Sequence, residues 1–559
     1  MKKNMGSNRL QPRLRKAAIA MASSAAILAF SAATAQSPVD LANPLVGTAP
    51  LDDPAVIGNA PPPGEPVYSG QTSPGARLPH GSVAASPVNN NIELLYPNGV
   101  PVPYYYTNPT MIGFTGGGGS TYGGGAEPII MPVVGDWSPP PAYSQSYYDK
   151  SREKASPGYY SVYLDTFRTQ VELTATRWAS VMRFTFPQSD RSNVIVNLPR
   201  HGGTVEVVGD RVVRGISKDK RSTDGAYFVA EFSKPFTALG TFRKSPGDNI
   251  GWGIGTSDVQ PGARDISGSY AGSYVTFKTK AGEQVLMKIA HGTSYEQAAE
   301  RLGAEVPGWD FDGVHSAARD TWAQFLNRVR VTGGTEKQRK LFYSTLFQSF
   351  ASPRLIAQKG EKFADTNGKV QVATHDRYGP VPFWDTGRNQ IVLLELMEPE
   401  AVQNIMASEL AMAREKGYMN TSFHGDNAVF LFLGAWERGI EFDYEAAYEY
   451  LRKNATDPKG PRGYLAEYMK QGWISDIVPD HNPSPPYAGG KAGADKTLEY
   501  AWDDYALALY AKKLGKDADY RMFLKRAGNY VNVFDKSIGF MRGRTADGKW
   551  IAPFDPAEP

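Results

Sequence analysis

Two carboxylates four residues apart, Glu499 and Asp503, lie in residues 496–505, Lys-Thr-Leu-Glu-Tyr-Ala-Trp-Asp-Asp-Tyr. If this segment is helical, both carboxylates lie on one face, because residues four apart are neighbours on a helix. Hydrolysis of a glycosidic bond requires two carboxyl groups that flank the bond. Carboxylates on adjacent turns of one helix point the same way and are poorly placed for that task. We therefore expect Glu499 to bind a ligand or to lie on a solvated face, and not to act with Asp503 as an acid–base pair.

A second group, Phe-Trp-Asp-Thr-Gly-Arg, occupies residues 383–388, just before an apolar segment. Trp384 offers a ring for the apolar face of a sugar, and Asp385 and Arg388 carry groups that can hydrogen-bond to adjacent hydroxyls. The same residues also fit the start of a helix, in which Asp385 or Thr386 caps the helix and Arg388 pairs with Asp385. The sequence alone leaves both interpretations open.

A third group, Ser-Phe-His-Gly-Asp-Asn, occupies residues 422–427, before another expected helix. His424, one of only 7 His in the chain, and Asp426 either bind a ligand, or Asp426 caps the helix beside a solvated His424. The glycine-rich residues 113–125 are followed by no Lys-Ser/Thr, so they do not form a phosphate-binding loop. They either allow close approach of the backbone to a ligand or form a flexible connection.

The elements that position these groups change in type along the chain. Residues 159–164, 171–176, 181–186 and 193–198 recur as short strands separated by turn residues, which is typical of a β-sandwich. Beyond about residue 293, helical patterns replace them. A capping box at Thr335–Gln338 opens one helix, which Pro353 stops. The other helices are expected at residues 294–302, 312–329, 387–397, 399–416, 427–439, 443–453, 463–471, 495–514 and 518–534.

Strands first and helices second predict separate domains within a multidomain β + α protein. We expect a β-sandwich over residues 36–290, followed by an (α/α)6 toroid over residues 291–559. These ten helices, with a loop at the end of the chain, are too few for six helical hairpins. We therefore expect the toroid to be incomplete in this sequence. A sandwich followed by a toroid is a common plan among glycosidases, although a plan alone does not establish a function.

The composition excludes several functional classes. A chain of 559 residues is too long for one ordinary core and predicts at least two domains. A net charge of only +3 argues against a nucleic-acid partner, which needs a concentrated basic surface. The absence of Cys excludes disulfides, thiolate nucleophiles and Cys-ligated zinc. Aromatic residues at 12% fit either a carbohydrate ligand or a well-filled core.

Residues 1–35 are typical of a secretory signal peptide. A region with several Lys and Arg precedes an apolar run at residues 17–30 and the small-residue site Ala33-Thr34-Ala35. We expect cleavage after Ala35 and a periplasmic or secreted protein. The apolar run is too short and too rich in Ala to be a stable membrane anchor.

Taken in order, these segments resemble glycoside hydrolase family 92, the calcium-dependent exo-α-mannosidases. The resemblance is carried by the opening Asn-Pro-Leu-Val-Gly-Thr at 43–48 and by Ser-Pro-Gly-Ala-Arg-Leu-Pro-His-Gly at 73–81, which is similar to a PGA-x-x-PFG loop. It continues through the glycine-rich loop, through residues 383–388, which resemble a WDTFR motif, and through residues 496–504, which resemble an S-x-TLEYAYDDW helix.

This resemblance implies a sandwich packed on an (α/α)6 domain, with the active site between them. It implies removal of terminal α-mannose from N-glycan or mannan fragments by inversion, so that the partner is a mannose-containing glycan. It also implies a Ca²⁺ ion that contacts two hydroxyls of the sugar. Trp384 and Asp385 would contact the terminal mannose, and Glu499 would line the site.

The sequence departs from the family pattern in several places. The family's general acid lies in an EGNAWQY-like motif after an FDP segment, and its base lies in a GNDD-like motif. Neither motif appears before Pro559, so we expect the acid, the base and most calcium ligands beyond that residue. Glycines at 116–119 replace an H-x-H-x-S-G-T-G pattern, and Gly387 replaces a Phe, which is expected to widen the pocket. Two alternatives are a non-catalytic sugar-binding form and a disaccharide phosphorylase of the same plan.

Overall fold

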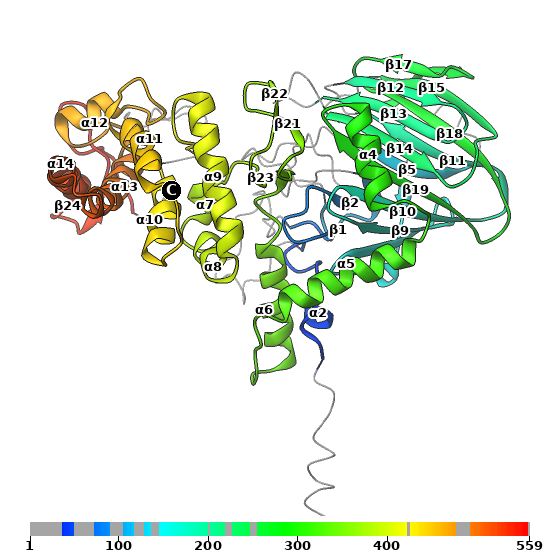
Figure 1. Ribbon diagram of the computed structural model, residues 1–559, viewed down its shortest axis with the longest axis horizontal. Helices are drawn as coiled ribbons and strands as arrows, with labels where there is room; N and C mark the ends of the chain where they lie inside the picture. The colour runs from blue at the N-terminus through cyan, green and yellow to red at the C-terminus, as the bar shows by residue number, and fades with distance from the viewer. Residues whose placement is uncertain are drawn as a thin grey trace, which may run out of the picture.

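The computed structural model describes residues 36–49, 72–89, 104–116, 128–135, 145–198, 202–218, 226–245, 254–421, 425–476 and 492–556. The predicted signal peptide, residues 117–125 of the glycine-rich loop and His424 lie outside these ranges. Within them, a β-rich domain and a helical domain lie side by side (Figure 1). This arrangement confirms the predicted order of a β domain followed by an α domain.

The β domain consists of two large antiparallel sheets. Along the first sheet the order is β1 (Ala76–Arg77), β2 (Ala84–Val88), β4 (Gly113–Thr115), β5 (Ile129–Val134), β11 (Ser189–Asn197), β18 (Ala271–Thr279), β15 (Ala238–Ser245) and β16 (Ile254–Pro261). Along the second it is β17 (Asp265–Ser267), β12 (Gly203–Val208), β13 (Val212–Ser217), β14 (Ala226–Phe232), β19 (Glu283–Gly292), β10 (Ala179–Phe186), β9 (Thr169–Ala175), β8 (Tyr159–Leu164) and β7 (Lys154–Ser156). The pair β3 (Thr110–Met111) and β6 (Ser146–Tyr147) lies beside them.

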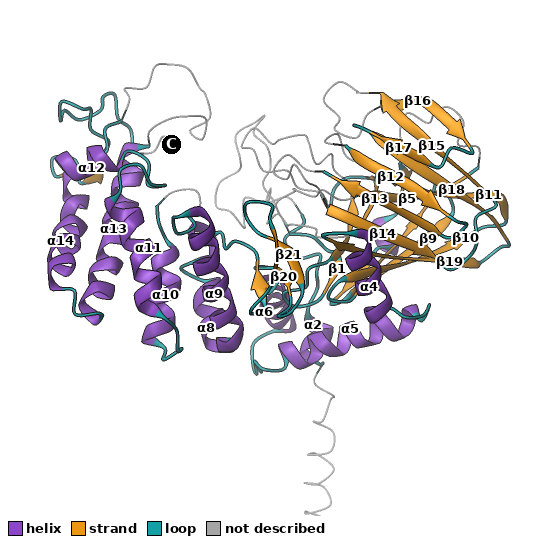
Figure 2. Ribbon diagram, turned by 45° about the horizontal axis from the view of Figure 1, so that its top comes forward, coloured by secondary structure: helices purple, strands orange, loops and turns teal. Residues whose placement is uncertain are grey.

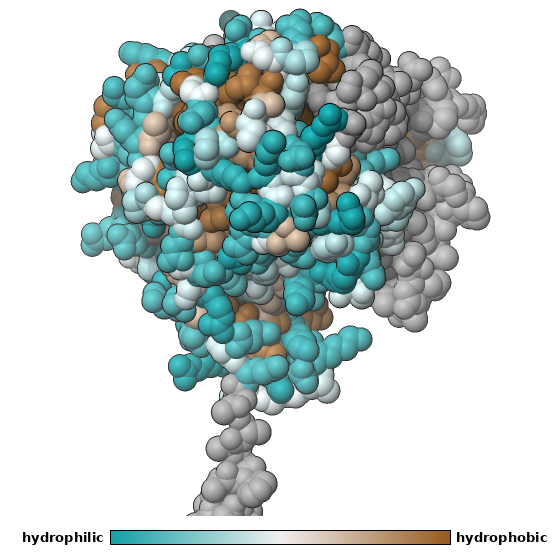
Figure 3. Space-filling view, turned by 90° about the vertical axis from the view of Figure 1, so that its right-hand side faces the viewer, coloured by the Kyte–Doolittle hydropathy of each residue, from teal (hydrophilic) through white to brown (hydrophobic). Residues whose placement is uncertain are grey.

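The alternating strand patterns are confirmed as β8, β9, β10 and β11. One apolar cluster between the sheets unites buried residues of both, such as Val194 and Val275 from the first sheet and Phe184 and Met287 from the second. On the outer face of the second sheet, α4 (Tyr295–Glu305) packs against β14 and β19. The sandwich therefore has one core between its sheets and a smaller one beneath α4. At the end of the sandwich remote from the helices, the described surface is mostly hydrophilic (Figure 3).

Two helices, α5 (Phe311–Leu326) and α6 (Glu336–Ser349), connect the sandwich to the remaining helices. The predicted capping box of α6 is confirmed, with Thr335 and Gln338 each bonding the other's backbone. The elements of the helical domain are α7 (Phe383–Thr386), α8 (Gln390–Met397), α9 (Pro399–Lys416), α10 (Ala428–Glu437), α11 (Tyr444–Thr456), α12 (Leu465–Gln471), α13 (Gly493–Lys513), α14 (Asp517–Ala527), the 3₁₀ turn η2 (Gly528–Val533) and the pair β24 (Phe534–Asp535) and β25 (Phe540–Met541).

Alternate helices of this domain are neighbours in space. Helix α10 packs between α8 and α13, while α9 packs against α11 (Figure 2). This two-row arrangement is that of the predicted (α/α)6 toroid. The sequence of α10, Ala-Val-Phe-Leu-Phe-Leu-Gly-Ala-Trp-Glu, is apolar on nearly every side, as expected of a helix enclosed by others. Among the described helices, none is long and apolar enough to cross a membrane.

One stretch of the helical half differs from the sequence prediction, which expected little β structure there. Two small antiparallel pairs form, β20 (Leu355–Ala357) with β23 (Arg377–Tyr378) and β21 (Lys362–Ala364) with β22 (Val370–Val372). Their strands are only two or three residues long, which is too short to create a recognisable period of two.

The two domains are joined through their backbones as well as their side chains. His80, from a loop of the sandwich, donates its backbone N–H to Phe350 O and accepts from Leu355 N, each at 3.0 Å. The fully buried Trp322 of α5 donates its indole N–H to Arg77 O at 2.6 Å. The loop that carries residues 77–80 is thus built into the start of the helical domain.

Candidate functional site

Trp384 and Asp385 lie on the single turn α7, which is anchored by its apolar neighbours. Val381 and Phe383 are only 2% and 1% exposed, so they fix the turn in the core. Trp384 is partly exposed, and Asp385 is exposed. The alternative in which Asp385 or Thr386 caps the next helix is wrong, because the N-cap of α8 is Asn389, which accepts from the Gln390 N–H.

Glu499, on the first half of α13, receives three donors from two separate segments, residues 383–388 and Asn427. The indole N–H of Trp384 and a guanidinium N–H of Arg388 both donate to its Oε1, each at 3.2 Å. The side-chain amide of Asn427 donates to its Oε2 at 3.3 Å. Arg388 therefore pairs with Glu499, and not with Asp385 as the capping interpretation required. This carboxylate brings residues of all three predicted groups, 383–388, 422–427 and 496–505, into one site.

An aromatic wall continues from this contact. The Arg388 guanidinium lies 5.7 Å from the ring centroid of Trp384 and 4.7 Å from that of Trp502. The Trp502 ring in turn lies 4.0 Å from the ring of Phe430 on α10. A cation between indole faces is an attractive arrangement that restricts the Arg388 side chain. Arg388 is thereby fixed at the edge of the site.

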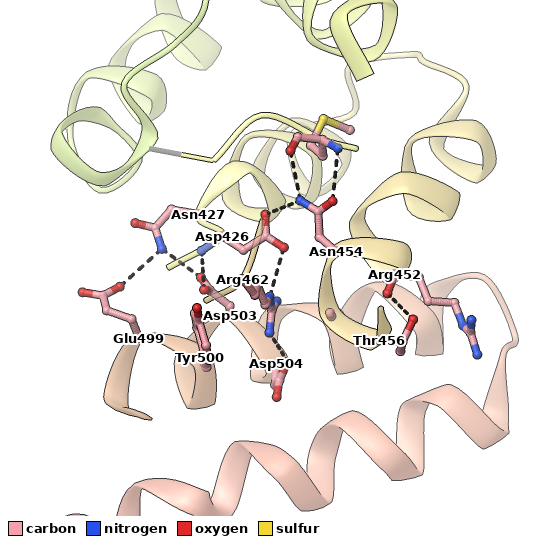
Figure 4. Close-up of polar contacts among 12 residues, drawn as sticks. Asp426, Asn427, Arg452, Asn454, Thr456, Arg462, Glu499, Tyr500, Asp503 and Asp504 are labelled. Carbon is pink, nitrogen blue, oxygen red and sulfur yellow. Dashed lines mark hydrogen bonds and ion pairs between the residues drawn. The ribbon is translucent and has the colours of Figure 1, made fainter. Parts of the chain in front are cut away.

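Asn427 joins the two carboxylates that share one face of α13. Its Nδ2 donates to Asp503 Oδ1 at 2.9 Å as well as to Glu499, as Figure 4 shows. The backbone N–H of Asp426 donates to the other oxygen of Asp503 at 2.6 Å. Asp503 is fully buried, and this burial raises its pKa to about 8, against the opposing effect of Arg462. A largely protonated Asp503 relieves the repulsion expected between like charges four residues apart.

The Asp426 side chain lies beside the contact between Asn427 and Asp503 and belongs to a buried ionic network. Its carboxylate accepts from Asn454 Nδ2 at 3.1 Å and from Arg462 Nε at 3.2 Å (Figure 4). Arg462 also donates to Asp504 at 2.8 Å, and Arg526 pairs with the same carboxylate at 2.8 Å. Burial raises the pKa of Asp426 to about 6, although Arg462 acts in the opposite direction. With 1% exposure and both oxygens bonded, Asp426 supports the site from within the protein.

The arrangement presents an aromatic face beside an available acceptor. Within the described residues, the Asp385 carboxylate makes no hydrogen bond, and it stands next to the half-exposed Trp384. Ring stacking together with a free carboxylate is the combination that holds a sugar by its apolar face and its hydroxyls. Among the described residues, no three His, Asp or Glu side chains come together as a metal site. The described His, Asp and Glu side chains therefore do not by themselves provide the ligands of a calcium site.

Sequence reasoning missed three residues that build this site. Asn427 adjoins the singled-out Asp426, but nothing in the sequence marks its amide as a bridge between Glu499 and Asp503. Arg462 and Asn454 lie in segments with no recognisable motif. The one available signal was the excess of acid in residues 503–504, since a buried acidic pair requires a cation from elsewhere.

Most of the chain matches two protein-family models. Residues 41–291 match the model of the glycosyl hydrolase family 92 N-terminal domain. Residues 297–559 match the model of the family's catalytic domain.

Individual relatives agree with these matches. An uncharacterized secreted glycosidase of Arthroderma benhamiae is 23% identical over 455 residues, which cover 72% of this chain and 54% of that protein. The chain thus spans about half the length of this curated relative. A family GH92 α-mannosidase from Bacteroides thetaiotaomicron superposes with a TM-score of 0.78 and 25% identity, covering 94% of this chain and 69% of that one. Another structure of that enzyme contains mannoimidazole. A GH92 inverting mannosidase from the same species gives 0.76 and 27%, with coverages of 93% and 68%.

Proposed function

The chain belongs to glycosyl hydrolase family 92, and from this premise we propose that the site around Trp384 and Glu499 binds the terminal α-mannose of a glycan. The observation that carries the proposal is the convergence of Trp384, Arg388 and Asn427 on Glu499, beside the exposed Asp385. In this proposal the sugar lies against the Trp384 ring, and Asp385 accepts hydrogen bonds from its hydroxyls. Glu499 orients Trp384 and Arg388 and lines the site.

For the protein to which this chain belongs, the proposed reaction is exo-hydrolysis of α-mannosides by inversion, with N-glycan or mannan fragments as substrates. Two solved structures similar to this chain are mannosidases, one of them described as inverting. Inversion requires an acid and a base on opposite sides of the bond. Glu499 and Asp503 share one face of α13 and one amide partner, which does not fit that requirement. We therefore propose that Glu499 and Asp503 are not the acid–base pair, and that the residues around Trp384 and Glu499 supply recognition.

The test is titration calorimetry with mannoimidazole, with calcium and with a chelator, compared with glucoimidazole. We expect mannoimidazole to bind and glucoimidazole to bind at least ~10-fold more weakly, a difference of about 1.4 kcal/mol. Trp384→Ala should abolish binding. Equal affinity for the two imidazoles would contradict recognition of mannose.

A parallel assay follows the release of mannose from an α-mannoside, with the first anomer identified by NMR. Binding without release supports a recognition role for this chain. Release of β-mannose would support inversion and would show that the chain contains its own acid and base. Phosphate-dependent release of a sugar phosphate would instead identify a phosphorylase.

We further propose that the protein is exported, with cleavage near Ala35. The proposal is supported by the basic and apolar pattern of residues 1–35 and by the description of the Arthroderma relative as secreted. N-terminal sequencing of the protein from a culture fraction tests it, and an intact Met1 in the cytoplasm would contradict it.

A further inference from the structure

The residue Val381, just before the Trp384 turn, has both of its backbone groups bound by side chains. Its N–H donates to Glu409 Oε1 at 2.8 Å, and its carbonyl accepts from Asn420 Nδ2 at 3.2 Å. Glu409 comes from the middle of α9 and is 0% exposed. Asn420 follows α9 and is half-buried. The side chains of Glu409 and Asn420 thus hold both backbone groups of Val381.

The position of Val381 determines where Trp384 and Asp385 lie. The Val381 carbonyl also accepts from Phe383 N at 3.0 Å, and the next carbonyl, Pro382 O, accepts from the backbone N–H groups of Asp385 and Thr386. Short-range backbone hydrogen bonds therefore link the residues between Val381 and Thr386. A shift at Val381 would carry the Trp384 indole away from Glu499 by the same movement.

The residues after α9, Met419 and Asn420, are also hydrogen-bonded toward the other side of the site. Asn454 accepts from Met419 N at 3.2 Å and donates to Met419 O at 3.0 Å, and its amide also bonds Asp426. Asp426 in turn bonds Asp503 through its backbone N–H. Met419 and Asn420 thus connect the Trp384 turn to the carboxylates of α13 through buried hydrogen bonds.

We propose that Glu409 and Asn420 are positioning residues that fix the Trp384 turn for binding of the sugar. The inference rests on the proposed recognition of mannose. Neither residue would touch the ligand, since Glu409 is enclosed in the core and Asn420 faces Val381. Their effect on affinity would come from keeping Trp384 and Asp385 in the binding arrangement before the ligand arrives.

The chemistry of Glu409 provides a sharp test. Burial raises its pKa to about 8, although the hydrogen bond from the Val381 N–H acts against the shift, as do Arg377 and Lys416. Its Oε2 has no hydrogen-bond partner among the described residues. At neutral pH the group is therefore mostly an uncharged acid. Glu409→Gln has the same shape and keeps an oxygen for the Val381 N–H, whereas Glu409→Leu has a similar volume and no acceptor.

A matched control is available on the neighbouring helix. Glu395 of α8 is 4% exposed and pairs at 2.6 Å with Arg438, at the end of α10, and not with Val381. Burial raises its pKa to about 7 as well. Glu395→Leu thus removes a buried carboxyl of the same kind and reports the effect of lost stability alone.

The experiment combines hydrogen-exchange mass spectrometry of peptides covering residues 378–388 with the Kd for mannoimidazole, on the full chain. For Glu409→Leu we expect exchange of these peptides to be about 10-fold faster and the Kd to rise by about 10-fold. Glu409→Gln should restore both to within about 2-fold of the wild type. Asn420→Ala, at a half-buried position that tolerates truncation better, should change both in the same direction as Glu409→Leu. Glu395→Leu should leave both near the wild-type values.

Two outcomes would overturn the inference. Wild-type exchange in Glu409→Leu and Asn420→Ala would show that the two side chains do not hold the turn. Faster exchange with an unchanged Kd would show that the turn is held but that binding does not depend on it. Failure of the wild type itself to bind mannoimidazole is a separate result, which would refute the proposed function and, with it, the inference that depends on it.

Discussion

The indole N–H of Trp384 donates to the carboxylate of Glu499 across 115 residues of sequence. Each residue comes from a segment that sequence reasoning singled out, and the fold brings the two within 3.2 Å. An indole held by a carboxylate has a fixed ring plane, which is what stacking on a sugar requires.

Replacing Glu499 by Gln should weaken binding of mannoimidazole by about 10-fold, or about 1.4 kcal/mol, because the donors from Trp384 and Arg388 lose a charged acceptor. Titration calorimetry measures the change. Glu437→Gln, at an exposed pair with Lys513, is the control and should leave the Kd unchanged. Equal Kd values for the Glu499→Gln variant and the wild type would remove Glu499 from the proposed site.

Replacing Arg462 by Met should destabilise the protein by about 3–5 kcal/mol, because Asp426 and Asp504 would lose their buried cation. Urea denaturation followed by circular dichroism reports the loss. Arg319→Met breaks an exposed pair with Asp40 and should cost only about 0–1 kcal/mol. Similar losses for the two variants would mean that the buried network contributes little.

Asp503 should make the stability of the protein depend on pH in a defined direction. Its folded pKa of about 8 lies well above 3.8, the ordinary value of an Asp side chain. The folded state therefore binds more protons than the unfolded state between these values, and stability must fall as pH rises from about 4 to about 8. Asp503→Asn removes this contribution. The stability of the variant relative to the wild type should improve steadily over that pH range, and a pH-independent difference would contradict the assignment.

Exposed apolar side chains of α8 and α13 should make the protein bind hydrophobic dyes. Leu396 of α8 is 68% exposed, and Trp502 and Tyr505 of α13 are 37% and 48% exposed. Large exposed apolar patches bind such dyes. The double variant Leu396→Ser/Tyr505→Ser should reduce dye fluorescence without lowering the melting temperature. Tyr147→Ser, at an exposed position of the sandwich, should leave the fluorescence unchanged.

The sequence predicted a helix or strand well where the residues that start and stop the element are adjacent to it in the sequence. Helix α9 begins and ends where it was expected, because Pro399 opens it and Gly417, with φ at 82°, closes it. The four sandwich strands were found by their alternation. The short strands at 355–378 were missed, because pairs of two or three residues leave no periodic pattern.

Helix α13 shows where periodicity fails. The stripe of Leu498, Trp502, Tyr505 and Leu509 has helical spacing, yet Trp502 and Tyr505 are exposed while Asp503 and Asp504 are fully buried. The acids are buried because Arg462 and Arg526 reach them from other segments. Partners brought by tertiary contact cannot be inferred from the spacing within one helix, and Asn427, Arg462 and Glu409 were missed for the same reason.

The backbone bonds of His80 have a consequence for how the protein can be divided. The family models meet between residues 291 and 297, but Phe350 and Leu355 pair with a loop that lies more than two hundred residues earlier in the chain. A fragment beginning at residue 293 would lose those partners and leave the indole N–H of Trp322 without its acceptor in a buried place. The boundary between the two family models is therefore not a boundary between two units that fold independently. The two domains should unfold in a single transition, and neither should survive limited proteolysis without the other.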